Sequence, residues 1–131
     1  MEHFLGRFSN FFYVLMRVIF GASFAQHGAQ KLFGALGGMG GSDAPAQLFS
    51  MMGAAGIIEF VGGVLIAVGF FTSYAAFISS GLMAVGYFMG HFPKGFWPIM
   101  NGGELAVLYC FAFLFIASQG GRALCIDRVR R

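Results

Sequence analysis

Four apolar segments, separated by glycine- and proline-rich breaks, constrain this chain more than any other feature of its sequence. They cover residues 8–33, 48–71, 75–92 and 101–119. A helix of roughly 20 apolar residues crosses a bilayer core of about 30 Å, and each segment is close to that length. Charged residues make up only 10% of the chain, whereas a typical soluble domain has about 25%. We therefore predict an all-α, polytopic transmembrane four-helix bundle that forms one domain over residues 1–131.

The basic residues are distributed unevenly between the two ends of these predicted helices. Four spans place both termini on the same side of the membrane. Basic residues on the side of the termini outnumber those on the other side, which predicts cytoplasmic termini. We expect a multi-pass protein of a bacterial-type inner (plasma) membrane. The first group comprises Arg7, Arg122, Arg128, Arg130 and Arg131, and the second comprises Lys31 and Lys94.

Two charged residues lie near the centre of predicted spans. Counted at about 1.5 Å per residue, Arg17 in the first span and Glu59 in the second reach similar depths. An unpaired charge at bilayer depth is costly, so such residues usually face the interior and find a partner. We predict a buried ion pair between Arg17 and Glu59 that fixes which helices meet. The alternative is that the two charges form one step of a proton path.

Several segments together resemble one protein family. These are Arg17 followed by GASFAQHGAQKLFG, then GIIEFVGGVLIAVGFFTSYAA, then NGGELAVLYC, and finally Asp127. In this combination the chain resembles the DoxX family of small four-helix membrane proteins, and the resemblance covers nearly the whole sequence. It implies a relationship to the membrane subunit of thiosulfate:quinone oxidoreductase. Other members are linked to membrane-associated oxidoreductase complexes that handle thiols and oxidative stress.

Four polar residues are expected near the outer membrane surface, at the ends of two predicted spans. His27 and Lys31 share one helix face, and Asn101 and Glu104 open the fourth span. A quinone needs a hydrogen-bond donor at each carbonyl and apolar walls for its tail. We predict that His27 and Asn101 donate, that Glu104 relays a proton, and that the aromatic walls are Phe24 and Trp97. The catalytic candidates are therefore Glu104 and His27, with Lys31 and Asn101 binding the ligand.

A simpler interpretation competes with this predicted site. Asn101 and Glu104 have the spacing of a helix capping box, so both side chains could serve only to cap the fourth helix. His27 and His91 lie at the ends of two spans, but no CxxCH motif or metal-ligand spacing accompanies them. We therefore expect neither haem nor a metal. Cys110 and Cys125 form no CxxC motif and are expected to be reduced.

The sequence contains no flavin, iron–sulfur or Rossmann signature, so electrons must come from elsewhere. We expect a quinone-interacting or anchoring subunit of a membrane redox complex, with a quinone as the one cofactor. Its expected partners are membrane lipids and either a redox partner subunit or a soluble donor, without nucleic acid. A homo-oligomer is left open. The alternatives are a non-catalytic assembly or scaffold protein and a carrier of small molecules or ions.

Overall fold

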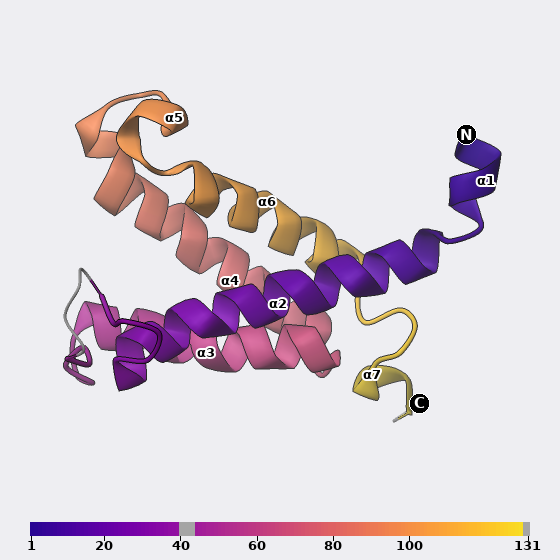
Figure 1. Cartoon of the computed structure of the whole chain (residues 1–131), viewed down its shortest axis with the longest axis horizontal. Helices are drawn as coiled ribbons and strands as arrows, with labels where there is room; N and C mark the ends of the chain where they lie inside the picture. Colours follow the sequence, from indigo (N-terminus) through magenta and orange to yellow (C-terminus); the bar gives the residue numbers. More distant parts are fainter. Residues whose placement is uncertain (40–43, 130–131) are drawn as a thin grey trace.

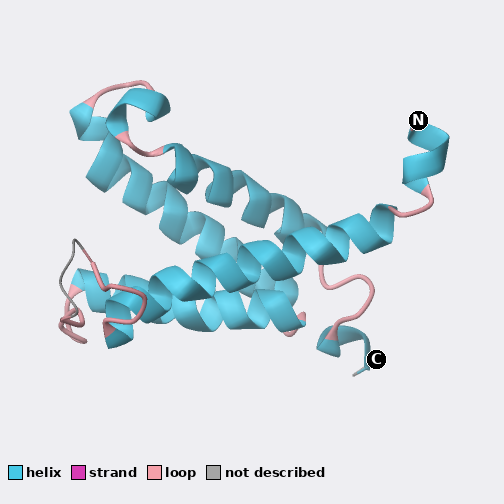
Figure 2. Cartoon of the chain, viewed as in Figure 1, coloured by secondary structure: helices cyan, strands magenta, loops and turns pink. Residues whose placement is uncertain are grey.

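The computed structural model describes residues 1–39 and 44–129, and its elements in this part are helical (Figure 2). The four predicted apolar segments correspond to four regions of long helix. Residues 40–43 of the glycine-rich connection, and Arg130 and Arg131 of the basic group, lie outside the described residues. The long helices are α2 (Ser9–Phe33), α3 (Met51–Val68), α4 (Thr72–Gly86) and α6 (Glu104–Gln119). The short elements are α1 (Glu2–Gly6), the π-helical turn η1 (Tyr87–His91), the 3₁₀ turn η2 (Phe92–Lys94), α5 (Pro98–Asn101) and α7 (Ile126–Val129).

The long helices form two antiparallel hairpins. Helix α2 lies along α3, and α4 lies along α6, whereas α2 and α6 have few contacts with each other (Figure 1). The short turn between α3 and α4 joins the hairpins at one end. Toward the other end, which carries η1, η2 and α5, the two hairpins diverge (Figure 1). The four predicted helices are thus present, in an arrangement of two hairpins that open toward one end.

Glycines hold α2 and α3 in one register. A Cβ atom at Gly28 of α2 would lie 2.3 Å from the backbone nitrogen of Phe60, and one at Gly63 of α3 would lie 2.5 Å from that of Ala25. Neither position accepts a side chain without separating the two backbones. Gly21 makes the same kind of contact with Ala67, at 2.6 Å. Small residues of this kind allow helices to approach closely, and here they fix which residues of α2 and α3 are level with each other.

The boundaries of α3 follow from local signals. Its N-terminus is capped by Ser50, whose hydroxyl oxygen accepts the Gly53 N–H at 3.1 Å. The capping residue after its C-terminus is Gly69, with φ +75°, a left-handed conformation that glycine adopts without steric cost. The next helix follows almost at once, so the α3–α4 turn is short. Gly34, with φ +64°, ends α2 in the same way.

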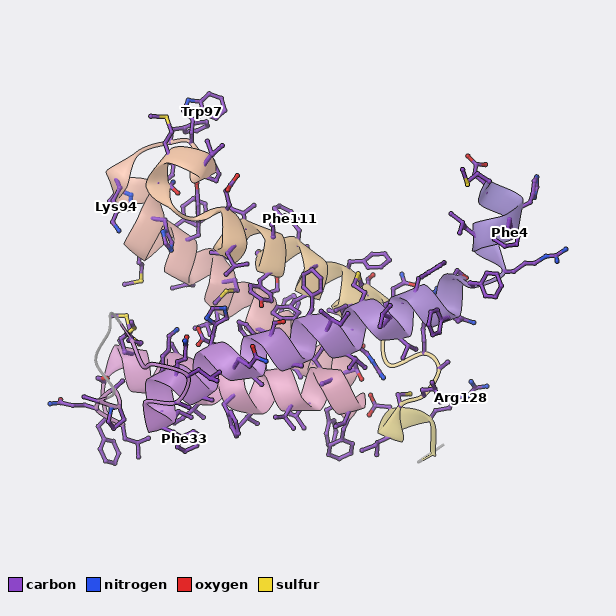
Figure 3. All side chains as sticks on the ribbon, in the orientation of Figure 1. Phe4, Phe33, Lys94, Trp97, Phe111 and Arg128 are labelled. Carbon is purple, nitrogen blue, oxygen red and sulfur yellow. The ribbon has the colours of Figure 1, made fainter. Side chains whose placement is uncertain are left out.

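Apolar side chains cover the outside of the molecule. Two helical segments are long and apolar enough to cross a membrane by length and composition: Met51–Val68, with mean hydropathy 2.0, and Thr72–Lys94, with mean hydropathy 1.3. Only 33% and 22% of their most apolar stretches are buried, unlike the core helix of a soluble protein. Phe77 on α4 and Phe111 on α6 are 65% and 66% exposed, and Phe111 points away from the helices (Figure 3). Such a surface suits contact with lipid.

Candidate functional site

A cavity of about 700 Å³ lies between the two hairpins, on the side where they diverge. Its volume falls in the range of small-molecule binding pockets, about 300–1,000 Å³. Flexible methionines, which pack against ligands of irregular shape, contribute from both hairpins: Met51 and Met52 from α3, Met83 from α4 and Met89 from η1. The polar residues of the lining are His27, Lys31, Glu59, His91 and Tyr109.

The charged part of the lining is an ion pair between α2 and α3. The Lys31 ammonium nitrogen lies 2.5 Å from Oε1 of Glu59. The Glu59 side chain is 3% exposed and that of Lys31 is 19% exposed, so the carboxylate is almost fully removed from solvent. Oε2 of Glu59 has no hydrogen-bond partner among the described residues. The cavity therefore has a buried carboxylate in its wall, and only one of the two carboxylate oxygens is hydrogen-bonded, to Lys31.

The predicted pair between Arg17 and Glu59 is wrong, because Glu59 pairs with Lys31 instead. The glycine contacts explain the difference. They place Gly28 level with the turn that contains Glu59, whereas Gly69, at the far end of α3, is level with Arg17. Arg17 and Gly28 are eleven residues apart, about 16 Å along the helix. Counting residues from the predicted span ends placed Arg17 and Glu59 at the same depth. In the observed register of α2 and α3 they lie at different depths.

Arg17 binds the segment that follows α6. Its guanidinium donates to the carbonyl oxygens of Gly121, at 3.0 Å, and Leu124, at 2.6 Å. The side chain is 1% exposed, and its Nε atom has no partner among the described residues. Tyr13, one turn earlier on α2, donates to the carbonyl of Gly120 at 2.5 Å. These residues of α2 hold residues 120–124 against the closed end of the molecule.

Asp127 fastens the same segment to the start of α4. Its carboxylate accepts the N–H groups of Phe71, at 2.7 Å, and Thr72, at 2.9 Å, and the Thr72 hydroxyl at 2.7 Å. Burial by itself raises the pKa of Asp127, but these hydrogen bonds and the nearby Arg17 outweigh it and lower the pKa from its ordinary value of 3.8. Asp127 follows Thr72 by 55 residues in the chain, so no local capping signal in the sequence predicts this role.

Three of the predicted ligand-binding residues do line the cavity: Phe24, His27 and Lys31. Phe24 is 1% exposed and belongs to an aromatic cluster in which its ring centroid lies 4.7 Å from that of Phe113 and 5.3 Å from that of Tyr109. The His27 ring lies edge-on to Tyr109, with centroids 6.1 Å apart. The aromatic cluster therefore forms the inner end of the cavity and positions His27 at its wall.

Asn101, Glu104 and Trp97 are not among the residues that line the cavity. The side chain of Asn101 is buried and fully engaged: its amide donates to the Gly95 carbonyl at 2.9 Å, and its oxygen accepts the Gly103 N–H at 2.8 Å. Glu104 is exposed at the start of α6, and Trp97, 63% exposed, points away from the helices (Figure 3). The four polar residues predicted near the outer surface do not converge on one site. His27 and Lys31 belong to α2 in the first hairpin, whereas Asn101, at the end of α5, and Glu104, at the start of α6, belong to the second hairpin.

The predicted capping box is present only in part. Asn101 uses its side-chain oxygen to hold the turn before α6, yet the helix starts at Glu104 with Gly103 as the capping residue and no side-chain cap. His91, at the end of the π-helical turn, lines the cavity, and its Nδ1 atom lies 3.2 Å from the Asn101 carbonyl oxygen. Within the described ranges, no group of three or more histidine, cysteine or acidic residues is arranged to hold a metal ion.

Comparisons with known proteins agree with the sequence patterns. The family model described as DoxX matches residues 12–92, which include α3, α4, all but the first three residues of α2, and the cavity residues that these helices contribute. A protein of Haemophilus influenzae, described as uncharacterized, is 38% identical to the chain over 130 residues, covering 94% of this chain and 93% of the relative. No solved structure matches the chain.

Proposed function

Since the chain belongs to the DoxX family, whose members are associated with membranes, we propose that it is a quinone-interacting or anchoring subunit of a membrane redox complex. The observation that carries this proposal is the cavity between the hairpins, with the Lys31–Glu59 pair in its wall. An apolar chamber with a few polar groups in its walls matches the chemistry of a lipophilic molecule with an oxygen-bearing ring. Quinones have this chemistry and reach such a site from the bilayer.

The polar residues of the cavity have distinct roles in this proposal. The Lys31 ammonium donates to a ring oxygen of the ligand, and His27 donates or accepts at a second polar position. Glu59, and not Glu104, is the carboxylate that faces the ligand, because Glu59 lines the cavity and Glu104 lies outside it. Phe24 and Tyr109 form the apolar end against which the ring packs.

The protein needs a partner to take part in electron transfer. The residues of the cavity supply hydrogen bonds, charge and apolar contact, whereas hydride and electron transfer in such complexes is carried by cofactors. A redox partner subunit or a soluble donor therefore delivers or removes electrons at the ligand. We further propose that the chain crosses a bacterial-type inner membrane several times with cytoplasmic termini, which is supported by its apolar surface and by the distribution of basic residues.

Filling the cavity tests the proposed binding site. Gly86 is the last residue of α4 and lines the cavity where the lining residues of α4 pass into those of η1, and a Cβ atom there meets no atom within 4 Å. Gly86→Leu therefore adds a side chain where the ligand would sit. Gly81 is also a helical residue of α4 with free space around it, but it does not line the cavity, so Gly81→Leu is the matched control.

Binding of a short-chain quinone to purified protein in nanodiscs is measured for the wild type and both variants, with melting curves recorded in parallel. The proposal predicts binding to the wild type and to Gly81→Leu, and a loss of at least about tenfold in affinity for folded Gly86→Leu, because the added side chain and the ring cannot occupy the same volume. Equal affinity for both folded variants contradicts the proposed site, and absence of binding to the wild type contradicts the proposed function.

A further inference from the structure

The Lys31–Glu59 pair leaves one strong hydrogen-bond acceptor without a donor. Oε1 of Glu59 receives the ammonium of Lys31, while Oε2 is buried and has no partner within the described part of the chain. A buried carboxylate oxygen in this position is destabilising, since it has lost its hydrogen bonds to water and has no hydrogen bond within the protein to replace them. The carboxylate lines the cavity, so the missing donor can come from a ligand bound there.

Within the described residues, no side chain around Glu59 donates a hydrogen bond to its Oε2 atom. On α3 its neighbours along the helix include Gly56, Gly62 and Gly63, which have no side chains and serve the contacts with α2 and α4. The other polar groups that face the cavity, His27, His91 and Tyr109, make no hydrogen bond to Glu59. The terminal torsion of a glutamate is soft, so a small rotation presents Oε2 to the cavity while Oε1 stays near the ammonium.

The pair therefore offers a donor and an acceptor side by side. An ionised carboxylate only accepts hydrogen bonds, and an ammonium only donates them. A ring hydroxyl complements both groups, because its hydrogen is donated to Oε2 and its oxygen accepts from the Lys31 ammonium. A ring carbonyl has no hydrogen, so it satisfies Lys31 and leaves Oε2 of Glu59 unpaired in a site that the ligand has sealed.

We propose that the Lys31–Glu59 pair distinguishes the oxidation states of the ligand, and that the cavity binds the hydroxyl-bearing reduced form, a quinol, in preference to the quinone. This inference rests on the proposed function and specifies its ligand. A site built to receive a hydroxyl group discriminates strongly against an analogue without it, because the buried polar group of the protein is then left unpaired. We expect a preference of about tenfold or more for the reduced form.

The test compares ligands that differ only in the hydroxyl group. Wild-type protein in nanodiscs is titrated anaerobically with a short-chain quinol, with the corresponding quinone, and with a redox-inert phenol and its methyl ether that carry the same tail. The phenol and its ether separate the effect of the hydroxyl from that of electron transfer. The expected result is that quinol binds more tightly than quinone, and phenol more tightly than ether, each by about tenfold or more.

Variants then assign the preference to Glu59. Glu59→Gln replaces the second acceptor by an amide that also donates, so the preference for quinol over quinone should fall to near unity. In Glu59→Gln/Lys31→Met the charge is balanced, which protects the fold if the single variant is unstable. Glu104→Gln removes an exposed acid outside the cavity and should keep the full preference.

The outcomes separate this inference from the function on which it rests. If the wild type binds quinol and quinone, or phenol and ether, with equal affinity, the inference is overturned while the binding site stands. If the wild type binds none of the four compounds, both the inference and the proposed function are overturned. If folded Glu59→Gln/Lys31→Met still prefers quinol over quinone, the assignment to this pair is also overturned. This outcome can be read even if the single variant Glu59→Gln does not fold.

Discussion

Asp127 caps the N-terminus of α4 from a distance of 55 residues along the chain: its Oδ2 atom accepts both the N–H and the hydroxyl of Thr72. The same carboxylate accepts the Phe71 N–H, and the Asp127 N–H donates to the Gly69 carbonyl at 2.9 Å. A residue beyond the last long helix thus completes the turn between α3 and α4. The segment is held from the other side by Arg17, so removing either residue loosens the same part of the structure.

Replacing Asp127 by alanine is expected to lower the free energy of unfolding by about 1–2 kcal/mol, because two backbone N–H groups at the start of α4 lose their acceptor. The measurement is denaturant unfolding of detergent-solubilised protein. Arg128→Ala is the control, since this neighbouring side chain is exposed. An equal loss of stability in both variants would show that the capping contacts are not responsible.

The contribution of Asp127 should depend on pH in one direction. Its hydrogen bonds lower the folded-state pKa below 3.8, so the charged form is favoured by folding. The stabilisation is therefore fully present above the unfolded-state pKa and is lost as the pH falls through the lower folded-state value. The difference in melting temperature between wild type and Asp127→Asn should be constant from pH 7 to about pH 5 and should shrink below about pH 4. A difference that grows on acidification would contradict the assigned shift.

The charge pairing makes a prediction for double-mutant cycles. Lys31→Met and Glu59→Gln should each reduce stability, and the double variant should lose less than their sum, with a coupling of about 1–3 kcal/mol. The cycle that combines Arg17→Met with Glu59→Gln should show coupling close to zero, because the glycine register separates these residues. Strong coupling in the second cycle would restore the pair predicted from the sequence.

The glycine contacts predict opposite effects for two alanine substitutions. Gly28→Ala places a methyl group 2.3 Å from the backbone nitrogen of Phe60, so α2 and α3 must separate and the free energy of unfolding should fall by about 2 kcal/mol or more. Gly81→Ala meets no atom within 4 Å and should be neutral or stabilising by up to about 1 kcal/mol. Thermal unfolding of both variants in one detergent gives the comparison, and similar effects would argue against the close contact.

The proposed topology is tested with single cysteines in a Cys110→Ala/Cys125→Ser background. Leu36, after the end of α2, is 69% exposed, and Arg7, before its start, is also exposed. A membrane-impermeant thiol reagent applied to spheroplasts should label Leu36→Cys and leave Arg7→Cys unlabelled until the membrane is opened. The reverse pattern would place the termini on the outer side.

The elements of the fold were readable from the sequence, whereas the relations between them were not. Glycines and prolines mark the breaks, and apolar runs of membrane length mark the helices, so α2, α3, α4 and α6 lie close to the predicted segments. The register between α2 and α3 could not be predicted in this way, because it depends on which glycine of one helix contacts which backbone atoms of the other. Gly28 against Phe60 sets Glu59 beside Lys31, and no count from the span ends contains that information.

The same limit applies to the candidate site. His27 and Lys31 were identified by their spacing on one helix and Phe24 as an aromatic wall, and all three line the cavity from α2. Asn101 and Glu104 were grouped with them by expected height alone, but they belong to the second hairpin, which diverges from the first. Tyr109 had no signal in the sequence, since a tyrosine in an apolar helix is ordinarily part of the core.

The fastening of residues 120–127 also has a consequence for the order of biosynthesis. Arg17 emerges from the ribosome about a hundred residues before Gly121 and Leu124, whose carbonyl oxygens accept the hydrogen bonds of its guanidinium. Until those residues are translated, its guanidinium needs other hydrogen-bond acceptors, such as water. A chain interrupted before Gly121 therefore lacks both carbonyl groups that bind the Arg17 guanidinium in the complete fold.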